Sequence, residues 1–191
     1  MSDRTTNVII CGTGGQGTLL ASEVLCAAAL FQGFDVKKSE VHGMAQRGGS
    51  VSSHVRFGRK VFSPLVEKGT ADLVLAMEKM EGIRWAPFLA PDGVLVSCDL
   101  EINPMTVQTG AAVYPDVEGL VREQGIPCRI VPAMEAAVEL GNPKVVNMVL
   151  LGAIAAHLPI DGENWTRAIG DRVPHRALDV NLEAFEKGRA L

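Results

Sequence analysis

The stretch IICGTGGQGTLLASEVL, residues 9–25, predicts a short buried strand, a glycine-rich turn and a helix. Gly12, Gly14 and Gly17 fit the pattern G-x-G-x-x-G. In that pattern the first glycine permits a tight turn, the second lets an anion approach the backbone, and the third lets the helix pack on the strand. The helix N-terminus would add free N–H groups and about half a positive charge. The turn therefore has the form of a phosphate-binding loop.

Three interpretations of this turn stay open: a dinucleotide site, a site for another anionic group, and a purely structural turn. A dinucleotide site requires an acidic residue about 20 residues later, for the ribose hydroxyl. Asp35 lies 18 residues beyond Gly17 and Glu40 lies 23 beyond, but neither falls clearly at the end of a predicted strand. The side-chain amide of Gln16 favours contact with a polar group beside the turn.

The rest of the chain alternates between strand and helix patterns. Strands are expected at residues 8–11, 34–38, 50–57, 71–77, 94–97 and 128–131, with a turn at 91–93. Helices are expected at residues 17–31, 78–89, 117–124, 133–140, 144–157, 164–169 and 177–187. This alternation predicts a single α/β domain over residues 1–191, a Rossmann-like, doubly wound, mostly parallel sheet with helices on both faces.

A second unusual segment is KKSEVHGMAQRGGSVSSHVRFGRK, residues 37–60, with an expected loop at 40–49. It holds six basic residues and one acid, a local charge of +5 in a chain whose net charge is −4. A charge run is usually a solvated face, and that interpretation stays open. Gly43, Gly48 and Gly49 lie around Arg47, however, which suggests backbone conformations that a plain solvated loop does not need. Because the segment follows the second predicted strand, we expect it at the same carboxyl edge as the glycine turn. Both loops and Arg47 could then meet at one anionic group.

Four other polar residues have structural interpretations. His42 and His54 lack a nucleophile or carboxylate at a catalytic spacing, so we expect them to be hydrogen-bonded histidines. Glu78 follows a predicted strand, and we expect it to be a charge favoured at a helix N-terminus. Asn147 lies in a strongly apolar helix, so its burial would require a hydrogen-bond partner.

Composition limits the function classes. The 191 residues are 47% hydrophobic and 21% charged, as in an ordinary soluble protein, and the net charge of −4 does not suggest nucleic acid binding. The most apolar stretch, residues 145–156, is shorter than the roughly 20 residues that span a bilayer, so no membrane association is expected. The first ten residues show no secretion signal, and we expect a cytoplasmic location.

The cysteines are Cys11, Cys26, Cys98 and Cys128. None are paired as C-x-x-C, and no Cys/His set has zinc-finger spacing. We expect them to be small buried apolar residues in a reducing compartment, and we expect no metal centre on this chain.

Four stretches together carry a resemblance to a known family: GTGGQG, SEVHGMAQRGGSVSSHVRFG, SPLVEKGTADLVLAMEKMEGIR and GNPKVVNMVLLGA. They resemble the gamma-type subunits of 2-oxoacid:ferredoxin oxidoreductases, and within these the beta subunits of indolepyruvate ferredoxin oxidoreductases. The match extends from about residue 7 to residue 188, and the second stretch is far more specific than the glycine turn. Residues 101–116 match no family motif.

The resemblance implies that an aryl 2-oxoacid and coenzyme A are converted to an acyl-CoA and carbon dioxide, with reduction of ferredoxin. Thiamine diphosphate and the iron–sulfur clusters would belong to a large alpha subunit, and coenzyme A would be a co-substrate. This chain would bind no cofactor tightly, would be inactive alone, and would reach ferredoxin through the complex. An isolated chain with an uncovered interface could form a homodimer.

The resemblance also implies a set of binding residues, and no catalytic or metal-binding ones. They would shape the subunit interface and contact the coenzyme A phosphates. In the turn they are Gly12, Gly14, Gly15, Gln16 and Gly17, and in the second motif they are Glu40, His42, Gly43, Gln46, Arg47, Gly48 and Gly49. Two alternatives remain: a free-standing NAD- or FAD-dependent oxidoreductase, and a non-enzymatic anion-binding protein.

Overall fold

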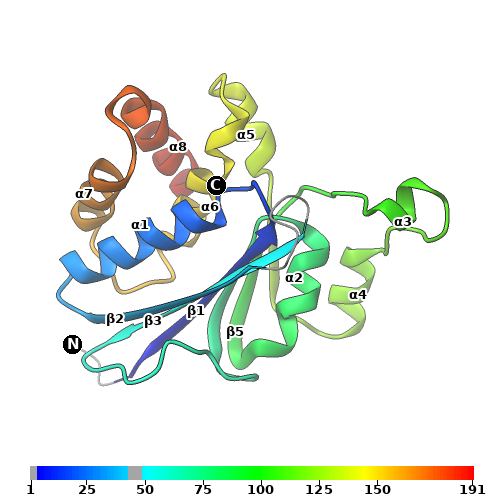
Figure 1. Ribbon diagram of the computed structural model, residues 1–191, viewed down its shortest axis with the longest axis horizontal. Helices are drawn as coiled ribbons and strands as arrows, with labels where there is room; N and C mark the ends of the chain where they lie inside the picture. Colours follow the sequence, from blue (N-terminus) through cyan, green and yellow to red (C-terminus); the bar gives the residue numbers. More distant parts are fainter. Residues whose placement is uncertain (1–3, 43–48) are drawn as a thin grey trace.

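The computed structural model describes residues 4–42 and 49–191, which form one mixed six-stranded sheet with helices on both faces (Figure 1). The strand order is β2-β3-β1-β4-β5-β6. The strands are β1 (Thr6–Thr13), β2 (Asp35–His42), β3 (Ser50–Gly58), β4 (Ala71–Ala76), β5 (Leu89–Cys98) and β6 (Cys128–Val131). The helices are α1 (Thr18–Phe31), α2 (Lys79–Trp85), α3 (Met105–Gln108), α4 (Val117–Glu123), α5 (Ala133–Glu139), α6 (Val146–Ala155), α7 (Gly162–Arg172) and α8 (Leu178–Ala190). Single 3-10 turns are η1 (Ala86–Phe88), η2 (Pro143–Val145) and η3 (His175–Ala177).

The prediction of a mostly parallel α/β sheet is confirmed, with one exception. Strands β1, β4, β5 and β6 pair in parallel, whereas β3 pairs antiparallel with both β1 and β2. The reason is the short connection between β2 and β3, because a parallel crossover requires a dozen or more residues. These two strands therefore form a hairpin, and β3 lies between β2 and β1.

Two boundaries differ from the predicted ones. Strand β2 continues to His42, so Glu40 and His42 lie on a strand and not in the loop expected at 40–49. The turn expected at 91–93 lies within β5, where Ala71 pairs with Leu89 but Leu73 pairs with Val94. The local signals of Pro91 and Gly93 thus mark an irregularity inside a strand and not its start.

The core has two halves, one on each face of the sheet. Alternate residues of β1 face opposite sides: Val8 and Ile10 pack with α1, α5, α6, α7 and α8, and Ile9 and Cys11 pack toward α2. Figure 1 shows the larger group of helices on one side of the sheet and α2 and α4 on the other. None of the helices in the described ranges is long and apolar enough to span a bilayer.

Helix α1 shows how the sequence sets these elements. Val24, Ala27 and Ala28 are buried on one face of it, as its apolar spacing predicts. Gly33 follows the helix with φ 92°, and the N–H of Phe34 donates to the carbonyl of Ala29 at 3.0 Å. This is the Schellman arrangement, in which a glycine in the left-handed region ends the helix.

Helices α6 and α8 cross closely because glycine backbones touch there. A Cβ atom at Gly188 would overlap the backbone carbonyl of Val149, and one at Gly152 would overlap the carbonyl of Phe185. All ten residues of α6 are buried, so this crossing has no room to relax. It holds the helical layer together on the face that carries α1.

We predict that Gly188→Ala lowers the free energy of unfolding by roughly 3 kcal/mol, because the new methyl group overlaps backbone that cannot move away. The matched control is Gly170→Ala in α7, where the added Cβ meets nothing within 4 Å. That change should stabilise the protein by about 0.5–1 kcal/mol, as alanine generally does relative to glycine within a helix. Denaturant unfolding of both variants measures the difference, and equal stabilities would contradict the close crossing.

Candidate functional site

The glycine turn and the end of the second motif meet at one edge of the sheet. The N–H of Gly14 donates to the carbonyl of Gly49 at 2.9 Å. Strand β2 runs in the same direction as β1, since both are antiparallel to β3, so the hairpin connection lies at the carboxyl end of β1. The predicted convergence of the two loops is thus confirmed at Gly14 and Gly49. The other predicted residues of the connection, Gly43, Gln46, Arg47 and Gly48, lie outside the described residues, as does the side chain of His42.

The turn is closed by the side chain of Gln16. Its Oε1 accepts the N–H of Thr13 at 2.6 Å, and its Nε2 donates to the carbonyl of Met77 at 2.9 Å. The amide therefore contacts polar groups of its own chain, and it joins the end of β1 to the residue after β4. Gly12 makes room for this contact, since a Cβ there would lie 2.7 Å from Gln16 Oε1 and 2.8 Å from Met77 Cβ.

The third glycine of the motif is fixed by a residue 130 positions away. Gly17 is the N-cap residue of α1, with φ 80°, and a Cβ there would lie 2.7 Å from Nδ2 of Asn147. Asn147 is 2% exposed, and its Nδ2 donates to the carbonyl of Gly17 at 3.3 Å. The hydrogen-bond partner that the apolar surroundings of Asn147 require is therefore the turn itself.

A cavity of about 550 Å³ opens beside the turn. Residues that line it are Gly14, Gly15, Gly17, Thr18, Glu23 and Val51. The N-terminus of α1 favours an anion there through its backbone N–H groups. Among the described residues that line this cavity, none is lysine or arginine, and Glu23 adds a carboxylate. Any cationic contact to an anion here would have to come from outside this lining.

The other flank of the edge holds two buried carboxylates that the sequence did not bring together. Glu78 caps α2, with Oε2 accepting the N–H of Glu81 at 2.9 Å, which confirms its predicted place at a helix N-terminus. Its Oε1 accepts from the N–H of Ile102 at 3.2 Å and from the hydroxyl of Tyr114. Oε2 of Glu81 accepts from the hydroxyl of Ser50 at 2.5 Å. Tyr114 is the chain's one tyrosine, which is the signal that could have drawn attention to it.

The two candidate ribose acids do not occupy a dinucleotide position. Asp35 begins β2 and pairs with Gly58, at the end of the hairpin opposite the glycine turn. Hydrogen bonds from Lys37 and from the N–H of Val61 lower its pKa to about 2. Glu40 lies nearer the turn, but it forms an ion pair with Lys38 at 2.5 Å, and β3 separates its strand from β1.

The basic segment is spread along the hairpin. Lys37 and Lys60 both contact Asp35, at 2.9 Å and 3.7 Å. Arg56 donates to Oδ1 of Asn7 and to the carbonyls of Ser63 and Leu65. The described cations of residues 37–60 therefore stabilise the hairpin and the loop after it. The expectation that the segment lies at the carboxyl edge is confirmed at Gly49 but does not extend to Lys37, Arg56 and Lys60, which lie toward the opposite end of the hairpin, near Asp35 and Gly58.

His54 has the structural role that the sequence predicts. Burial lowers its pKa, and its Nδ1 accepts the N–H of Val66 at 3.1 Å, which requires the neutral ring. Trp85 and Phe88 pack edge-on against it, with ring centroids 5.4 Å and 6.1 Å away. The imidazole lies on the α2 face of the sheet and does not border the cavity beside the glycine turn.

The cysteines do not fit an iron–sulfur cluster. Cys26 and Cys98 pack on the α1 face of the sheet, whereas Cys11 and Cys128 pack on the α2 face. Burial raises the pKa of the Cys26 thiol to about 11 and that of Cys98 to about 12, so these thiols are protonated. Within residues 4–42 and 49–191, no three His, Cys, Asp or Glu side chains gather in a way that could hold a metal ion.

Residues 7–191 match a known family, described as pyruvate ferredoxin/flavodoxin oxidoreductase. The chain belongs to this family. A relative in Pyrococcus horikoshii, named indolepyruvate oxidoreductase subunit IorB, is 38% identical over 188 residues, which are 95% of this chain and 93% of that protein. A relative in Methanothermobacter thermautotrophicus, named 2-oxoglutarate synthase subunit KorC, is 31% identical and covers 95% of this chain and 92% of its own.

The fold of this family also occurs inside a longer chain. The structure of a 2-oxoglutarate:ferredoxin oxidoreductase from Magnetococcus marinus superposes with a TM-score of 0.75 and 21% identity. The match covers 99% of the present chain and 31% of that one. The same fold therefore occurs as a chain of its own and as one part of a larger polypeptide.

We predict that Gln16→Met lowers the free energy of unfolding by about 1–3 kcal/mol, because it leaves the Thr13 N–H and the Met77 carbonyl without their partner. The matched control is Gln124→Met, at an exposed position after α4, which should change stability by less than about 0.5 kcal/mol. Urea unfolding monitored by tryptophan fluorescence measures both variants. If the Gln16→Met variant is as stable as the control, the two hydrogen bonds of the Gln16 amide do not stabilise the fold.

Proposed function

We propose that this chain is the small subunit of a heteromeric indolepyruvate:ferredoxin oxidoreductase, and that its carboxyl edge docks on the cofactor-bearing large subunit. The observation that carries the proposal is 38% identity over nearly the full length of a protein named as such a subunit. Identity to the relative named for 2-oxoglutarate is lower, at 31%. The substrate class of the proposal is therefore an aryl 2-oxoacid.

In this proposal the reaction takes place on the large subunit. A 2-oxoacid, coenzyme A and two oxidised ferredoxins give an acyl-CoA, carbon dioxide, a proton and two reduced ferredoxins. Thiamine diphosphate and iron–sulfur clusters on the large subunit supply the carbanion chemistry and the electron path. The four separated, protonated thiols of this chain support that division, because cluster ligands must be thiolates that lie close together.

In the proposal, this chain helps to position coenzyme A and covers its site on the large subunit. The N-terminus of α1, with Gly14, Gly15 and Gly17 around the 550 Å³ cavity, would face the coenzyme A phosphates, and Arg47 would supply the guanidinium that the described lining lacks. Gly12 and Gln16 would hold the turn in shape for that contact. The positions of Asp35 and Glu40 argue against a nicotinamide or flavin in the same cavity.

The subunit assignment predicts a simple reconstitution result. The purified chain should show no coenzyme A-dependent reduction of ferredoxin with indolepyruvate, and co-expression with the large subunit should give activity that prefers indolepyruvate over 2-oxoglutarate. The test is a spectrophotometric assay of the chain, the large subunit and the complex. Turnover by the isolated chain, or a flavin or nicotinamide that co-purifies with it, would contradict the assignment.

The coenzyme A contact predicts a separate kinetic effect. In the complex, Arg47→Ala should raise the KM for coenzyme A about tenfold, equivalent to about 1.4 kcal/mol of binding, and leave the KM for the 2-oxoacid unchanged. Lys60→Ala is the matched control, because Lys60 lies at the opposite end of the hairpin beside Asp35. If the two variants have the same KM for coenzyme A, Arg47 does not contact coenzyme A. The subunit assignment would not be affected by that result.

A further inference from the structure

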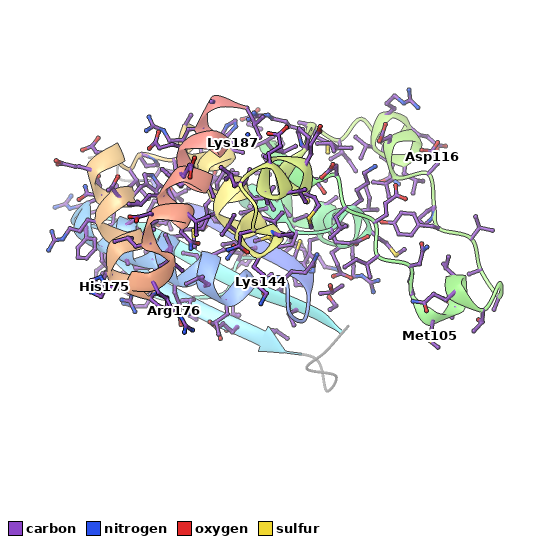
Figure 2. The ribbon with its side chains drawn as sticks, turned by 90° about the horizontal axis from the view of Figure 1, so that it is seen from above. Met105, Asp116, Lys144, His175, Arg176 and Lys187 are labelled. Atoms are coloured by element: carbon purple, nitrogen blue, oxygen red, sulfur yellow. The ribbon has the colours of Figure 1, made fainter. Side chains whose placement is uncertain are left out.

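The segment of residues 102–113, here called the arm, projects from the body of the molecule beside the carboxyl edge. Figures 1 and 2 show it with α3 (Met105–Gln108) extending away from α2 and α4. Figure 2 shows Met105 at the lower right and Asp116 at the upper right, where the chain has returned to begin α4. Residues 101–116 match none of the four family motifs, so those motifs assign no role to the arm.

The arm has the composition of an interface and not of a solvated loop. Its sequence, INPMTVQTGAAV, contains no charged residue, in a chain that is 21% charged. Val113 is 90% exposed and Met105 is 69% exposed. The buried centres of protein interfaces are depleted in charge and enriched in methionine, whereas exposed loops are rich in charge. The composition of the arm therefore fits contact with a protein partner better than full exposure to water.

The arm is also held in shape at both ends by one carboxylate. Glu78, which is 2% exposed, accepts the N–H of Ile102 at one end and the hydroxyl of Tyr114 just past the other. Inside the arm, Nε2 of Gln108 donates to the carbonyl of Asn103 at 2.7 Å, and the N–H of Ala112 donates to the carbonyl of Thr106 at 2.9 Å. A segment fixed in this way loses less conformational entropy when a partner binds it.

The arm and the glycine-turn edge form one continuous surface. A cavity of about 330 Å³ lies between them, lined by Thr13 and Ser50 from the edge and by Ile102, Pro104 and Met105 from the arm. Since both flanks border the same hollow, a partner that docks on the carboxyl edge meets the arm as well. The surface proposed above for the large subunit thus continues onto the arm.

The charges at the base of the arm indicate the chemistry of the partner. Glu101 and Glu118 share one cation, Lys79, at 3.2 Å and 3.1 Å, and Asp116 adds a third carboxylate. A second copy of this chain would bring two such acidic bases together in a symmetric dimer, which like-charge repulsion disfavours. A partner groove with an apolar floor and a basic rim would complement both parts of this surface. The floor would receive the uncharged arm, and the rim would face the carboxylates at its base.

We propose that the arm inserts into an apolar, basic-rimmed groove of the large subunit and anchors this chain on it. The inference rests on the proposed function, since the partner is the large subunit named there. Met105 and Val113 are the anchoring side chains, and Glu78 is a positioning residue that fixes the arm from behind. Interfaces commonly derive most of their affinity from a few such buried side chains.

The test measures binding of full-length chain to the purified large subunit by biolayer interferometry. The double substitution Met105→Lys and Val113→Lys should raise the Kd at least tenfold, because it places two charges in an apolar groove. The matched control is Leu30→Lys, at an exposed leucine (53%) near the C-terminus of α1, and it should leave the Kd unchanged. Thermal unfolding and size-exclusion chromatography of each variant report on folding and on self-association.

A footprint tests the same inference without relying on a disruptive change. The introduced thiol in Val113→Cys should react rapidly with maleimide, because position 113 is exposed. The native thiols should react slowly, because burial raises the pKa of Cys11, Cys26, Cys98 and Cys128. The large subunit should slow this labelling at least tenfold and leave that of Leu30→Cys unchanged.

The outcomes separate the arm from the subunit assignment. If the wild-type chain binds the large subunit but the charged arm binds equally well and position 113 is not protected, the arm proposal is overturned and the assignment stands. If the wild-type chain does not bind the large subunit at all, the assignment fails and the arm proposal fails with it. If the substitutions convert a dimer of this chain to a monomer, the occupant is a second copy, which overturns the large-subunit proposal.

Discussion

The carboxyl edge depends on the two hydrogen bonds of one side-chain amide. Gln16 accepts from the N–H of Thr13 and donates to the carbonyl of Met77, so it spans the gap between the ends of β1 and β4. Both are backbone groups at strand ends, since Thr13 is the last residue of β1 and Met77 follows β4, and buried backbone groups require hydrogen-bond partners. The amide satisfies them and fixes the turn that leads into α1. The contact of Gly14 with Gly49 and the contact of Gly17 with Asn147 then join that turn to β3 and to α6.

The glycine motif has the form of a nucleotide-binding turn, but the strand beside it differs from that of a dinucleotide-binding fold. In a dinucleotide fold the strand next to β1 ends in the acid that binds ribose. Here β3 occupies that place, runs antiparallel, and ends at Gly58 on the far side of the sheet. The geometry keeps the helix N-terminus beside the glycine turn but not the ribose contact. Such an edge suits a surface that meets a phosphate already bound by a partner protein.

Local patterns predicted much of the fold. The strand–turn–helix of residues 9–25, the continuous burial of β1 and β4 and the end of α1 at Gly33 all follow from neighbouring residues. The antiparallel direction of β3 follows from the short connection before it, although the helix-alternation rule suggested otherwise. The direction of the Gln16 amide, the Gly17–Asn147 contact and the clamp of Glu78 on Tyr114 join residues 61, 130 and 36 positions apart. Residue spacing along one sequence carries no information about such pairs, which only the packed structure brings together.

The central claim is that the glycine-turn edge and the adjoining arm form a docking surface on a cofactor-bearing subunit. A cryo-electron microscopy structure of the chain in complex with its large subunit tests it most directly. The account predicts that Gly14, Gly15, Met105 and Val113 are buried against that subunit, with the open cavity at the N-terminus of α1 facing coenzyme A. Finding these residues in solvent, or a nicotinamide or flavin in that cavity, would contradict it.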